Sequence, residues 1–300
     1  MVDERHIIGV KGLGDPFILN FGRKYYLYYT DIEHGAKGFC VRQSIDLKNW
    51  SAPKRIYEIG DSSYGDRDFW APEVVYRDGK FIMHYSCRGK QSGSLRICAA
   101  VSENPDGIFA DISDKKPLFD FGYSCIDGTV FTDGEKNYLF YSRDCSENIV
   151  DGIHESQIYA VELTRDLTGI VGSPVLIIRP DREYEFISGT WRWNEAPSVI
   201  KHGELYYLTY STNYFKSRYY SVCYAVSAHL LYGWTKPEHN ILLQFKEGVI
   251  SGPGHNSFFS DNEGKTRCAY HIHSEYGVGG EDRQLCIGQL VFSGDEPKII

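Results

Sequence analysis

The chain has 300 residues, of which 42% are hydrophobic and 24% charged, a composition typical of a globular protein long enough to bury a sizeable core. Its formal net charge of −8 argues against a nucleic acid as the main partner. The sequence has no apolar run of about 18 residues, the length that a membrane-spanning helix needs. Its N-terminal residues are charged where a signal peptide is apolar. The eight scattered cysteines form no CxxC pair and lack zinc-site spacing, so we expect reduced, buried thiols in a cytoplasmic protein.

Strand-forming residues dominate from the N-terminus onwards. The chain contains 23 tyrosines, 16 phenylalanines and 30 glycines, and these residue types favour strands joined by turns over helices. Five stretches each predict an apolar strand, a glycine-containing turn and a second strand that ends near a tyrosine. They are 15–30, 71–86, 127–142, 196–211 and 256–271. After each stretch we expect a third strand, a turn and a short outer strand. These segments are 41–50, 99–109, 159–170, 224–234 and 287–297.

The five stretches share one register. When Pro16, Pro72, Gly128, Pro197 and Ser257 are taken as the reference position, a tyrosine follows 13 places later in all five without a gap. A four-stranded unit repeated in this way predicts an all-β fold, a five-bladed β-propeller with four-stranded blades, as one catalytic domain over 1–300. The third interval is roughly a dozen residues longer than its neighbours, which predicts an extra loop within 143–193. The alternative is a pair of β-sandwiches.

Acidic residues recur beside the reference position. Asp15 and Asp127 directly precede it, while Glu195 and His255 stand two places before it. The first strands of propeller blades line the central axis, so these side chains should meet at one end of it. Burying three carboxylates together costs several kcal/mol, which suggests a functional site. Taken singly, each aspartate can form an Asx-turn, Glu195 can be a solvated loop residue, and His255 a core histidine.

Three convergent carboxyl groups suit glycoside hydrolysis. One can deprotonate water, a second can protonate the leaving oxygen, and a third can raise the pKa of that acid. Aromatic rings then stack on the apolar faces of sugars, although each such ring can instead belong to the core. The candidates near the anchors are Phe69, Trp70, Trp191, Trp193 and Tyr214.

Five motifs in chain order resemble the family 43 glycoside hydrolases, the five-bladed propeller family of arabinofuranosidases, arabinanases and xylosidases. The motifs are Gly14-Asp15-Pro16 with the strand 25–30, Trp70-Ala71-Pro72-Glu73, Ile126-Asp127-Gly128, Glu195-Ala196-Pro197 and Gly252-Pro253-Gly254-His255. The resemblance covers nearly the whole chain.

The resemblance implies a role for each matched residue. Asp15 is expected to be the general base, Glu195 the general acid and Asp127 the group that tunes and orients that acid. Family members invert configuration, so the Asp15 and Glu195 carboxyls should lie roughly 6.5–9.5 Å apart. Arg283 resembles an arginine that holds the terminal sugar; its alternative is an ion pair with Glu281 or Asp282. No cofactor is expected to be required, although some members hold a calcium or sodium ion through the residue that matches His255 and several waters.

The resemblance also guides the choice of substrate. Many xylosidases of the family carry a C-terminal β-sandwich, which is not expected here because the chain ends at Ile300 after the fifth unit. We therefore expect an inverting exo-acting enzyme that releases terminal α-L-arabinofuranosyl units from plant-derived arabinose- and xylose-containing oligosaccharides, with β-D-xylosidase side activity. The alternatives are an endo-α-1,5-arabinanase, a galactan-directed enzyme and a non-catalytic carbohydrate-binding propeller.

The pocket must then be closed by other parts of the protein. A homo-oligomer or the chain's own loops could do so. The candidate loops are 31–39, 60–69, 143–157, 181–194 and 274–282.

Overall fold

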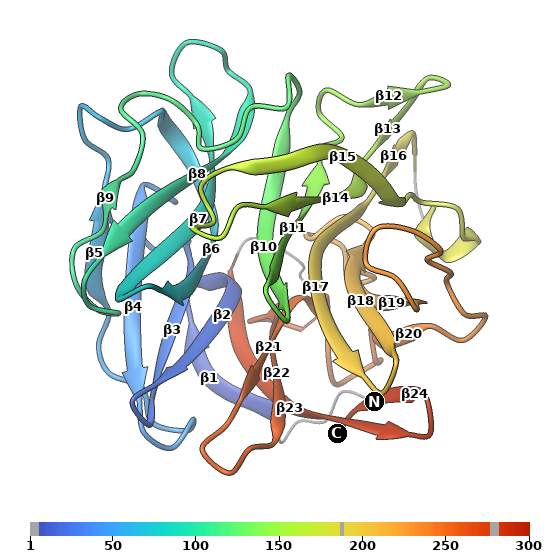
Figure 1. Ribbon diagram of the computed structural model, residues 1–300. Helices are drawn as coiled ribbons and strands as arrows, with labels where there is room; N and C mark the ends of the chain where they lie inside the picture. The colour runs from blue at the N-terminus through green and yellow to red at the C-terminus, as the bar shows by residue number, and fades with distance from the viewer. Residues whose placement is uncertain (1–5, 187–188, 277–281) are drawn as a thin grey trace.

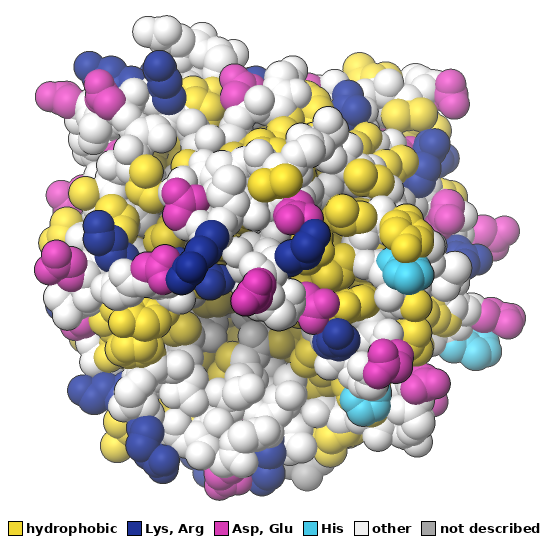
Figure 2. Space-filling model, in the orientation of Figure 1, with side chains coloured by type: hydrophobic (Ala, Val, Ile, Leu, Met, Phe, Trp, Pro, Cys, Tyr) yellow, Lys and Arg dark blue, Asp and Glu magenta, His cyan; other side chains and the backbone are white. Residues whose placement is uncertain are grey.

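The protein is built from β-strands. The computed structural model describes residues 6–186, 189–276 and 282–300; these ranges contain no α-helix, and a 3₁₀ turn, η2, lies at Glu183–Glu185. The predicted all-β class is therefore confirmed. No helix in the described ranges is long and apolar enough to cross a membrane. Acidic and basic side chains are intermingled on the face drawn in Figure 2, with hydrophobic groups between them.

Four sheets each consist of four antiparallel strands that follow one another in the chain (Figure 1). The first has β2 (Leu13–Phe21), β3 (Lys24–Asp31), β4 (Gly38–Ser44) and β5 (Lys54–Glu58). The second has β6 (Gly65–Arg77), β7 (Lys80–Gly89), β8 (Leu95–Ser102) and β9 (Ala110–Asp111). The third has β10 (Cys125–Asp133), β11 (Lys136–Arg143), β14 (Gln157–Leu163) and β15 (Ile170–Ile178). The fourth has β17 (Asn194–His202), β18 (Leu205–Thr212), β19 (Ser221–Ser227) and β20 (Ile241–Leu243).

The fifth sheet joins the two ends of the chain. It contains β21 (Gly254–Ser260), β22 (Thr266–His273) and β23 (Arg283–Ser293), and the N-terminal strand β1 (Ile7–Lys11) pairs with β23 as its fourth member. The last strand, β24 (Glu296–Ile299), also pairs with β23. A hydrogen bond of 2.9 Å joins His6 Nδ1 and the Tyr270 hydroxyl beside this junction. The start of the chain therefore protects an edge strand that would otherwise be open.

The first strands of the five sheets contact one another in a ring, in the order β2, β6, β10, β17, β21 and again β2. Five clusters of buried side chains fill the spaces between neighbouring sheets, one for each neighbouring pair. Each cluster is rich in aromatic residues, which explains the high aromatic content of the sequence.

The long third interval contains a small additional sheet. Its strands are β12 (Ile149–Val150), β13 (Ile153–Glu155) and β16 (Trp191–Arg192), and β13 and β16 run parallel. The predicted loop within 143–193 is therefore partly strand. Such short pairings carry little sequence pattern, since a strand of two or three residues cannot show alternation.

Each inner strand has an irregular register near its start, and a non-glycine residue there adopts a left-handed backbone. The φ angles lie between 47° and 55° for Asp15, Ala71, Asp127, Ala196 and His255. Such a conformation costs about 1–3 kcal/mol per residue and is typical of functional sites. These five residues mark one end of the ring.

In the fifth sheet, His255 occupies the position that Asp15 occupies in the first sheet. The register predicted from the sequence assigned Asn256 to this position, one residue too late. Gly14 pairs with Thr30, and Gly254 pairs in the same way with His271. The gapless count missed this shift because the turn between β21 and β22 is longer than the turn between β2 and β3.

Side chains of the preceding sheet hold these left-handed residues in place. The backbone N–H of Asp127 donates to Ser86 Oγ at 3.0 Å, and that of His255 to Ser211 Oγ at 2.8 Å. Equivalent bonds run from Ala71 to Thr30 Oγ1 at 2.8 Å and from Asp15 to His271 Nδ1 at 3.1 Å. The acceptors all stand near the end of the second strand of a sheet.

Replacing Ile8 and Val10 of β1 together by alanine should lower the free energy of unfolding by about 2 kcal/mol, because both partly buried side chains pack on the cluster between the fifth and first sheets. Urea unfolding followed by tryptophan fluorescence measures the change. The exposed Lys11→Ala on the same strand is the control and should stay within about 0.5 kcal/mol of wild type. Equal stabilities of the two variants would show that β1 does not hold the fifth sheet together.

Candidate active site

A cavity of about 410 Å³ lies at the end of the ring marked by the left-handed residues. Residues of all five sheets line it. Eight candidate residues from the sequence are among them: Asp15, Trp70, Asp127, Trp193, Glu195, Tyr214, His255 and Arg283. The structure thus brings the three predicted carboxyl groups into one pocket.

Asp15 is surrounded by cationic and hydroxyl groups. Its Oδ1 atom lies 2.9 Å from Arg283 Nη1 and 3.2 Å from His255 Nδ1, and Thr30 donates its hydroxyl to Oδ2 at 2.6 Å. Burial acts to raise the pKa of Asp15, but the Arg283 guanidinium, the His255 imidazole and His271 together hold that pKa well below its usual range. Asp15 is therefore an ionised carboxylate over the whole range in which the protein is expected to work.

Glu195 has the opposite environment. Its Oε1 atom accepts a bond of 3.4 Å from the Tyr220 hydroxyl. Burial and the carboxylates of Asp127, Asp144 and Asp15 raise the pKa of Glu195 well above its usual range. Glu195 can therefore remain protonated where Asp15 is ionised.

Asp127 is attached directly to the segment that carries Glu195. Its Oδ2 atom accepts the backbone N–H of Ala196 at 3.0 Å, so the aspartate holds the residue that follows Glu195. Burial raises the pKa of Asp127 to about 6; the positive charge of His255 opposes this rise and Asp15 reinforces it. Asp127 can thus orient Glu195 and influence its charge at the same time.

Arg283 is in the pocket rather than at the surface. Its side chain is 8% exposed and pairs with Asp15. Glycine at position 14 permits this approach, because a Cβ there would collide with the guanidinium. Of its two alternative partners, Glu281 lies outside the described residues and Asp282 accepts a bond from the Gly12 N–H at 3.2 Å.

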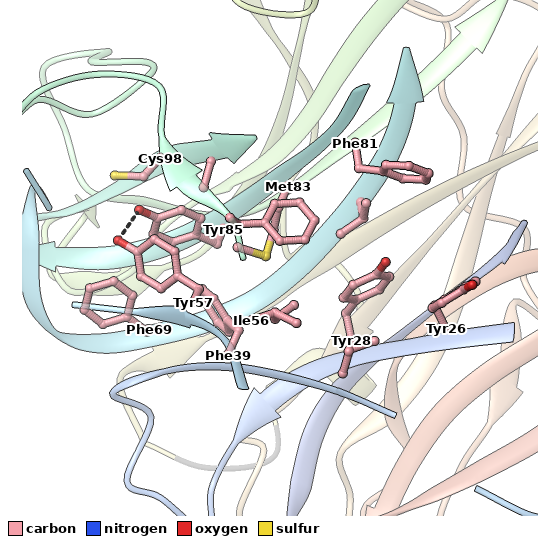
Figure 3. Close-up of a cluster of buried hydrophobic side chains, with 14 of the residues drawn as sticks. Tyr26, Tyr28, Phe39, Ile56, Tyr57, Phe69, Phe81, Met83, Tyr85 and Cys98 are labelled. Atoms are coloured by element: carbon pink, nitrogen blue, oxygen red, sulfur yellow. Dashed lines mark hydrogen bonds between the residues drawn. The ribbon is translucent and has the colours of Figure 1, made fainter. Parts of the chain in front are cut away.

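The prediction that Phe69 binds substrate is corrected by its position. Phe69 is fully buried and belongs to the cluster between the first and second sheets, where it stacks on Tyr85 with ring centroids 5.7 Å apart. Figure 3 shows it beside Phe39, Tyr57 and Tyr85, with the two tyrosine hydroxyls joined by a bond of 3.0 Å. The strand alternates its side chains between the two faces, so Trp70 lines the pocket while Phe69 turns away from it.

The two tryptophans before Glu195 have different positions. Trp193 lines the pocket, together with Tyr214 and Phe215. The predicted binding residue Trp191 is not among the lining residues; it is 39% exposed and lies next to Trp193.

Two further acidic residues lie near the predicted triad. Asp144 lines the pocket, and Glu73 accepts the Thr129 hydroxyl at 2.6 Å between the second and third sheets. Burial raises the pKa of Glu73 to about 7. Glu73 is the acidic residue of the Trp-Ala-Pro motif, so its place was available from the sequence. Asp144 follows a strand end without any motif.

Most of the predicted closing loops contribute to the lining. Ile32, Gly35 and Ala36 come from 31–39, and Asp68 comes from 60–69. Asp144 comes from 143–157, and Trp193 comes from 181–194. Residues 187–188 of that last loop and 277–281 of the loop 274–282 lie outside the described residues.

His255 lies among the carboxylates of Asp15, Asp127 and Glu73. Its Nδ1 atom is paired with Asp15, and although burial acts to lower the pKa of His255, the carboxylates of Asp15 and Asp127 raise it overall, which favours the protonated ring. Within the described residues, three potential ligands meet at Asp31, His34 and Cys40. A calcium or sodium ion near His255 stays a prediction, and no catalytic step below depends on one.

A buried ion pair supports the segment before Glu195. Lys236 Nζ donates to Glu185 Oε1 at 2.9 Å and to Asn194 Oδ1 at 2.9 Å, and all three side chains are buried. Asn194 in turn donates to Glu185 at 3.1 Å. No spacing in the sequence connects Lys236 with the other two residues, so sequence reasoning missed this group.

The model of the family described as glycosyl hydrolases family 43 matches residues 8–297. The chain belongs to this family. The resemblance seen in the five motifs is therefore confirmed, and the pocket with the three carboxyl groups is the candidate active site of a family 43 glycoside hydrolase.

Relatives within family 43 have different specificities. A thermostable family-43 glycoside hydrolase of known crystal structure is 41% identical with a TM-score of 0.91, covering 97% of this chain and 93% of that chain. An endo-1,4-beta-xylanase from Bacteroides thetaiotaomicron VPI-5482 is 30% identical with a TM-score of 0.84, covering 97% and 95%. An extracellular exo-alpha-(1->5)-L-arabinofuranosidase from Streptomyces avermitilis is 25% identical over 89% of this chain, which spans 56% of that protein. Family membership therefore supports a glycosidase without fixing its sugar.

Replacing Lys236 with methionine should lower the free energy of unfolding by about 3–5 kcal/mol, because it leaves the buried Glu185 carboxylate without its cation. Thermal and urea unfolding measure the loss. Lys298→Met removes a half-exposed lysine from a surface pair with Glu296 and should change the stability by less than about 1 kcal/mol. A Lys236→Met protein as stable as this control would contradict the structural role given to the buried pair.

Proposed function

We propose that this protein is an inverting, exo-acting glycoside hydrolase that releases terminal α-L-arabinofuranosyl units from arabinose- and xylose-containing oligosaccharides, with β-D-xylosidase side activity. The observation that carries the proposal is the opposite electrostatic environment of two carboxyls in one pocket. Arg283 and His255 keep Asp15 ionised, while burial and neighbouring carboxylates keep Glu195 protonated. One base and one acid at the same pH are what glycosidic bond cleavage with inversion requires.

The residues divide the reaction between them. Asp15 accepts a proton from a water molecule as that water attacks the anomeric carbon, and Glu195 gives its proton to the glycosidic oxygen as the bond to that carbon breaks. The products are the free sugar, with inverted configuration, and the shortened alcohol. Asp15 ends protonated and Glu195 ionised, and exchange of one proton with solvent restores both.

The proposed exo action places a chain end in this pocket. Residues from all five sheets line it, and Trp70 with Ile32 and Ala36 forms part of its wall. The pocket is partly open to solvent, and the end of an oligosaccharide can enter from that side. α-L-Arabinofuranose and β-D-xylose have similar hydroxyl arrangements, so one pocket can accept both sugars. An endo-arabinanase or a galactan-directed enzyme would release different products from the same panel of oligosaccharides.

Three further parts of the proposal concern the whole protein. The ring of five inner strands supports a five-bladed propeller that acts as a single catalytic domain over 1–300. All eight cysteines are buried thiols without disulfide partners, which supports a cytoplasmic location. We also propose that the protein forms a homo-oligomer.

Replacing Glu195 with glutamine should lower kcat on an α-1,5-linked arabino-oligosaccharide by about 10³-fold or more, because the leaving oxygen loses its proton donor. Release of arabinose, followed by chromatography, measures the rate. The variant should fold normally and still bind the oligosaccharide in calorimetry. Unchanged arabinose release would refute the assignment of Glu195, and binding without any turnover by the wild-type protein would favour a carbohydrate-binding propeller.

Replacing Asp127 with asparagine should narrow the pH profile of kcat/KM on its alkaline side. The negative charge of Asp127 helps to raise the pKa of Glu195, so its removal lowers that pKa and Glu195 loses its proton at a lower pH. Initial rates from pH 4 to 9 on an aryl arabinofuranoside and on an arabino-oligosaccharide give the alkaline limb. Asp15 stays ionised in this range, so its protonation does not contribute to the change. An alkaline limb at the wild-type position would argue against the tuning role.

A further inference from the structure

The inserted sheet between the third and fourth sheets carries a row of aromatic rings that leads out of the active site. Trp191 of β16 stacks on His154 of β13, with centroids 3.9 Å apart and planes within 9° of each other. The next ring is Trp193, 6.3 Å from Trp191, and then Tyr214, 5.5 Å from Trp193. This aromatic row begins inside the pocket, because Trp193 and Tyr214 line it, and ends outside at Trp191.

The outer part of the aromatic row is open to solvent although it is apolar. Trp191, at the outer end, is 39% exposed, and Tyr214, at the pocket end, is 41% exposed. A single exposed ring needs no explanation, but these rings are contiguous with the cavity that holds Glu195. The outer end of the aromatic row lies on the inserted sheet of β12, β13 and β16. The repeated four-stranded sheets do not need this insertion, so the fold alone does not explain the aromatic row.

The aromatic row is held rigidly. The His154 ring bonds to the Cys145 carbonyl oxygen through Nδ1 at 2.9 Å, and the parallel pairing of β13 with β16 sets His154 opposite Trp191. Asn194, directly after Trp193, is fixed by Glu185 and Lys236. A surface that is already ordered loses little conformational entropy on binding a ligand.

The chemistry of the pocket decides which part of a substrate would meet the aromatic row. Trp193 precedes Glu195 by two residues, on the same segment. Glu195, as the acid, must face the glycosidic oxygen that departs with the leaving group. The part of the substrate beyond that oxygen therefore lies on the Glu195 side of the pocket.

We infer that the aromatic row from Trp193 to Trp191 binds the leaving-group part of an oligosaccharide, with the apolar faces of successive sugar units stacked on the rings. The inference rests on the proposed function and makes it more specific, because it assigns substrates with two or more sugar units beyond the bond that is cleaved. Trp193 contacts the unit nearest the bond, and Trp191 a unit farther away.

Chain-length dependence tests the inference. kcat/KM is measured on α-1,5-arabinobiose, arabinotriose and arabinotetraose for wild type and for Trp191→Ala, with β-1,4-xylo-oligosaccharides of the same lengths as a second series. Wild type should become more efficient with length. Trp191→Ala should lose about tenfold in kcat/KM on the tetrasaccharide, mainly through KM, and less than about twofold on the disaccharide, since one stacked sugar is lost.

Two variants serve as controls. Tyr232→Ala removes a ring that is 63% exposed and does not line the pocket, and it should leave every kcat/KM unchanged. Trp191→Phe keeps an aromatic face and should restore most of the length dependence. Thermal unfolding of all variants detects a folding defect.

The outcomes separate the inference from the proposed function. Equal losses on all chain lengths, or no loss on the tetrasaccharide, would overturn the leaving-group site. A change from released monosaccharide to released disaccharide in Trp191→Ala would place the bound units on the other side of the cleaved bond and would also overturn it. Wild-type protein that cleaves neither series would instead refute the proposed function itself.

Discussion

The site depends on one type of hydrogen bond, in which the backbone N–H of a left-handed residue donates to a side chain of the preceding sheet. The N–H of Asp127 reaches Ser86, and the N–H of His255 reaches Ser211, so each inner strand starts at a position set by its neighbour. The bonds continue round the ring, and the side chains that follow them therefore arrive at one end. The strain of five left-handed residues is the cost of this arrangement. Asp15, Asp127 and His255 suit these points because aspartate and histidine tolerate the conformation better than most residues, whereas Ala71 and Ala196 lack this advantage.

The charges of the pocket follow from the same geometry. Asp15 is adjacent to the fifth sheet, which supplies the Arg283 guanidinium and the His255 ring, and these two groups keep it ionised. Glu195 is adjacent to the third sheet, which supplies Asp127 and Asp144, and this anionic surrounding keeps it protonated. The order of the sheets thus separates an acid from a base, and no large difference in solvent exposure between the two residues is needed.

The sequence was sufficient for features that repeat and insufficient for those that do not. The turn glycines and the tyrosine register recur in all five units and an acidic anchor occurs in three of them, so the all-β class and the convergence of Asp15, Asp127 and Glu195 could be predicted. The longer turn after β21 broke the count and misplaced His255 by one residue. Phe69 and Trp70 are neighbours in the chain but face opposite sides of β6. Lys236 and Asp144 act through contacts between distant segments, which no local pattern records.

The pairing of β1 with β23 has a consequence for how the protein is made. Ile7 can find its partner Cys286 only after the fifth sheet has been synthesised, 279 residues later in the chain. The first four sheets can pack as they emerge, but β1 must wait, unpaired, until β23 has left the ribosome. Completion of the ring is then a long-range event of the kind that slows folding. A nascent chain stalled before residue 283 would expose both an unpaired β1 and an incomplete fifth sheet.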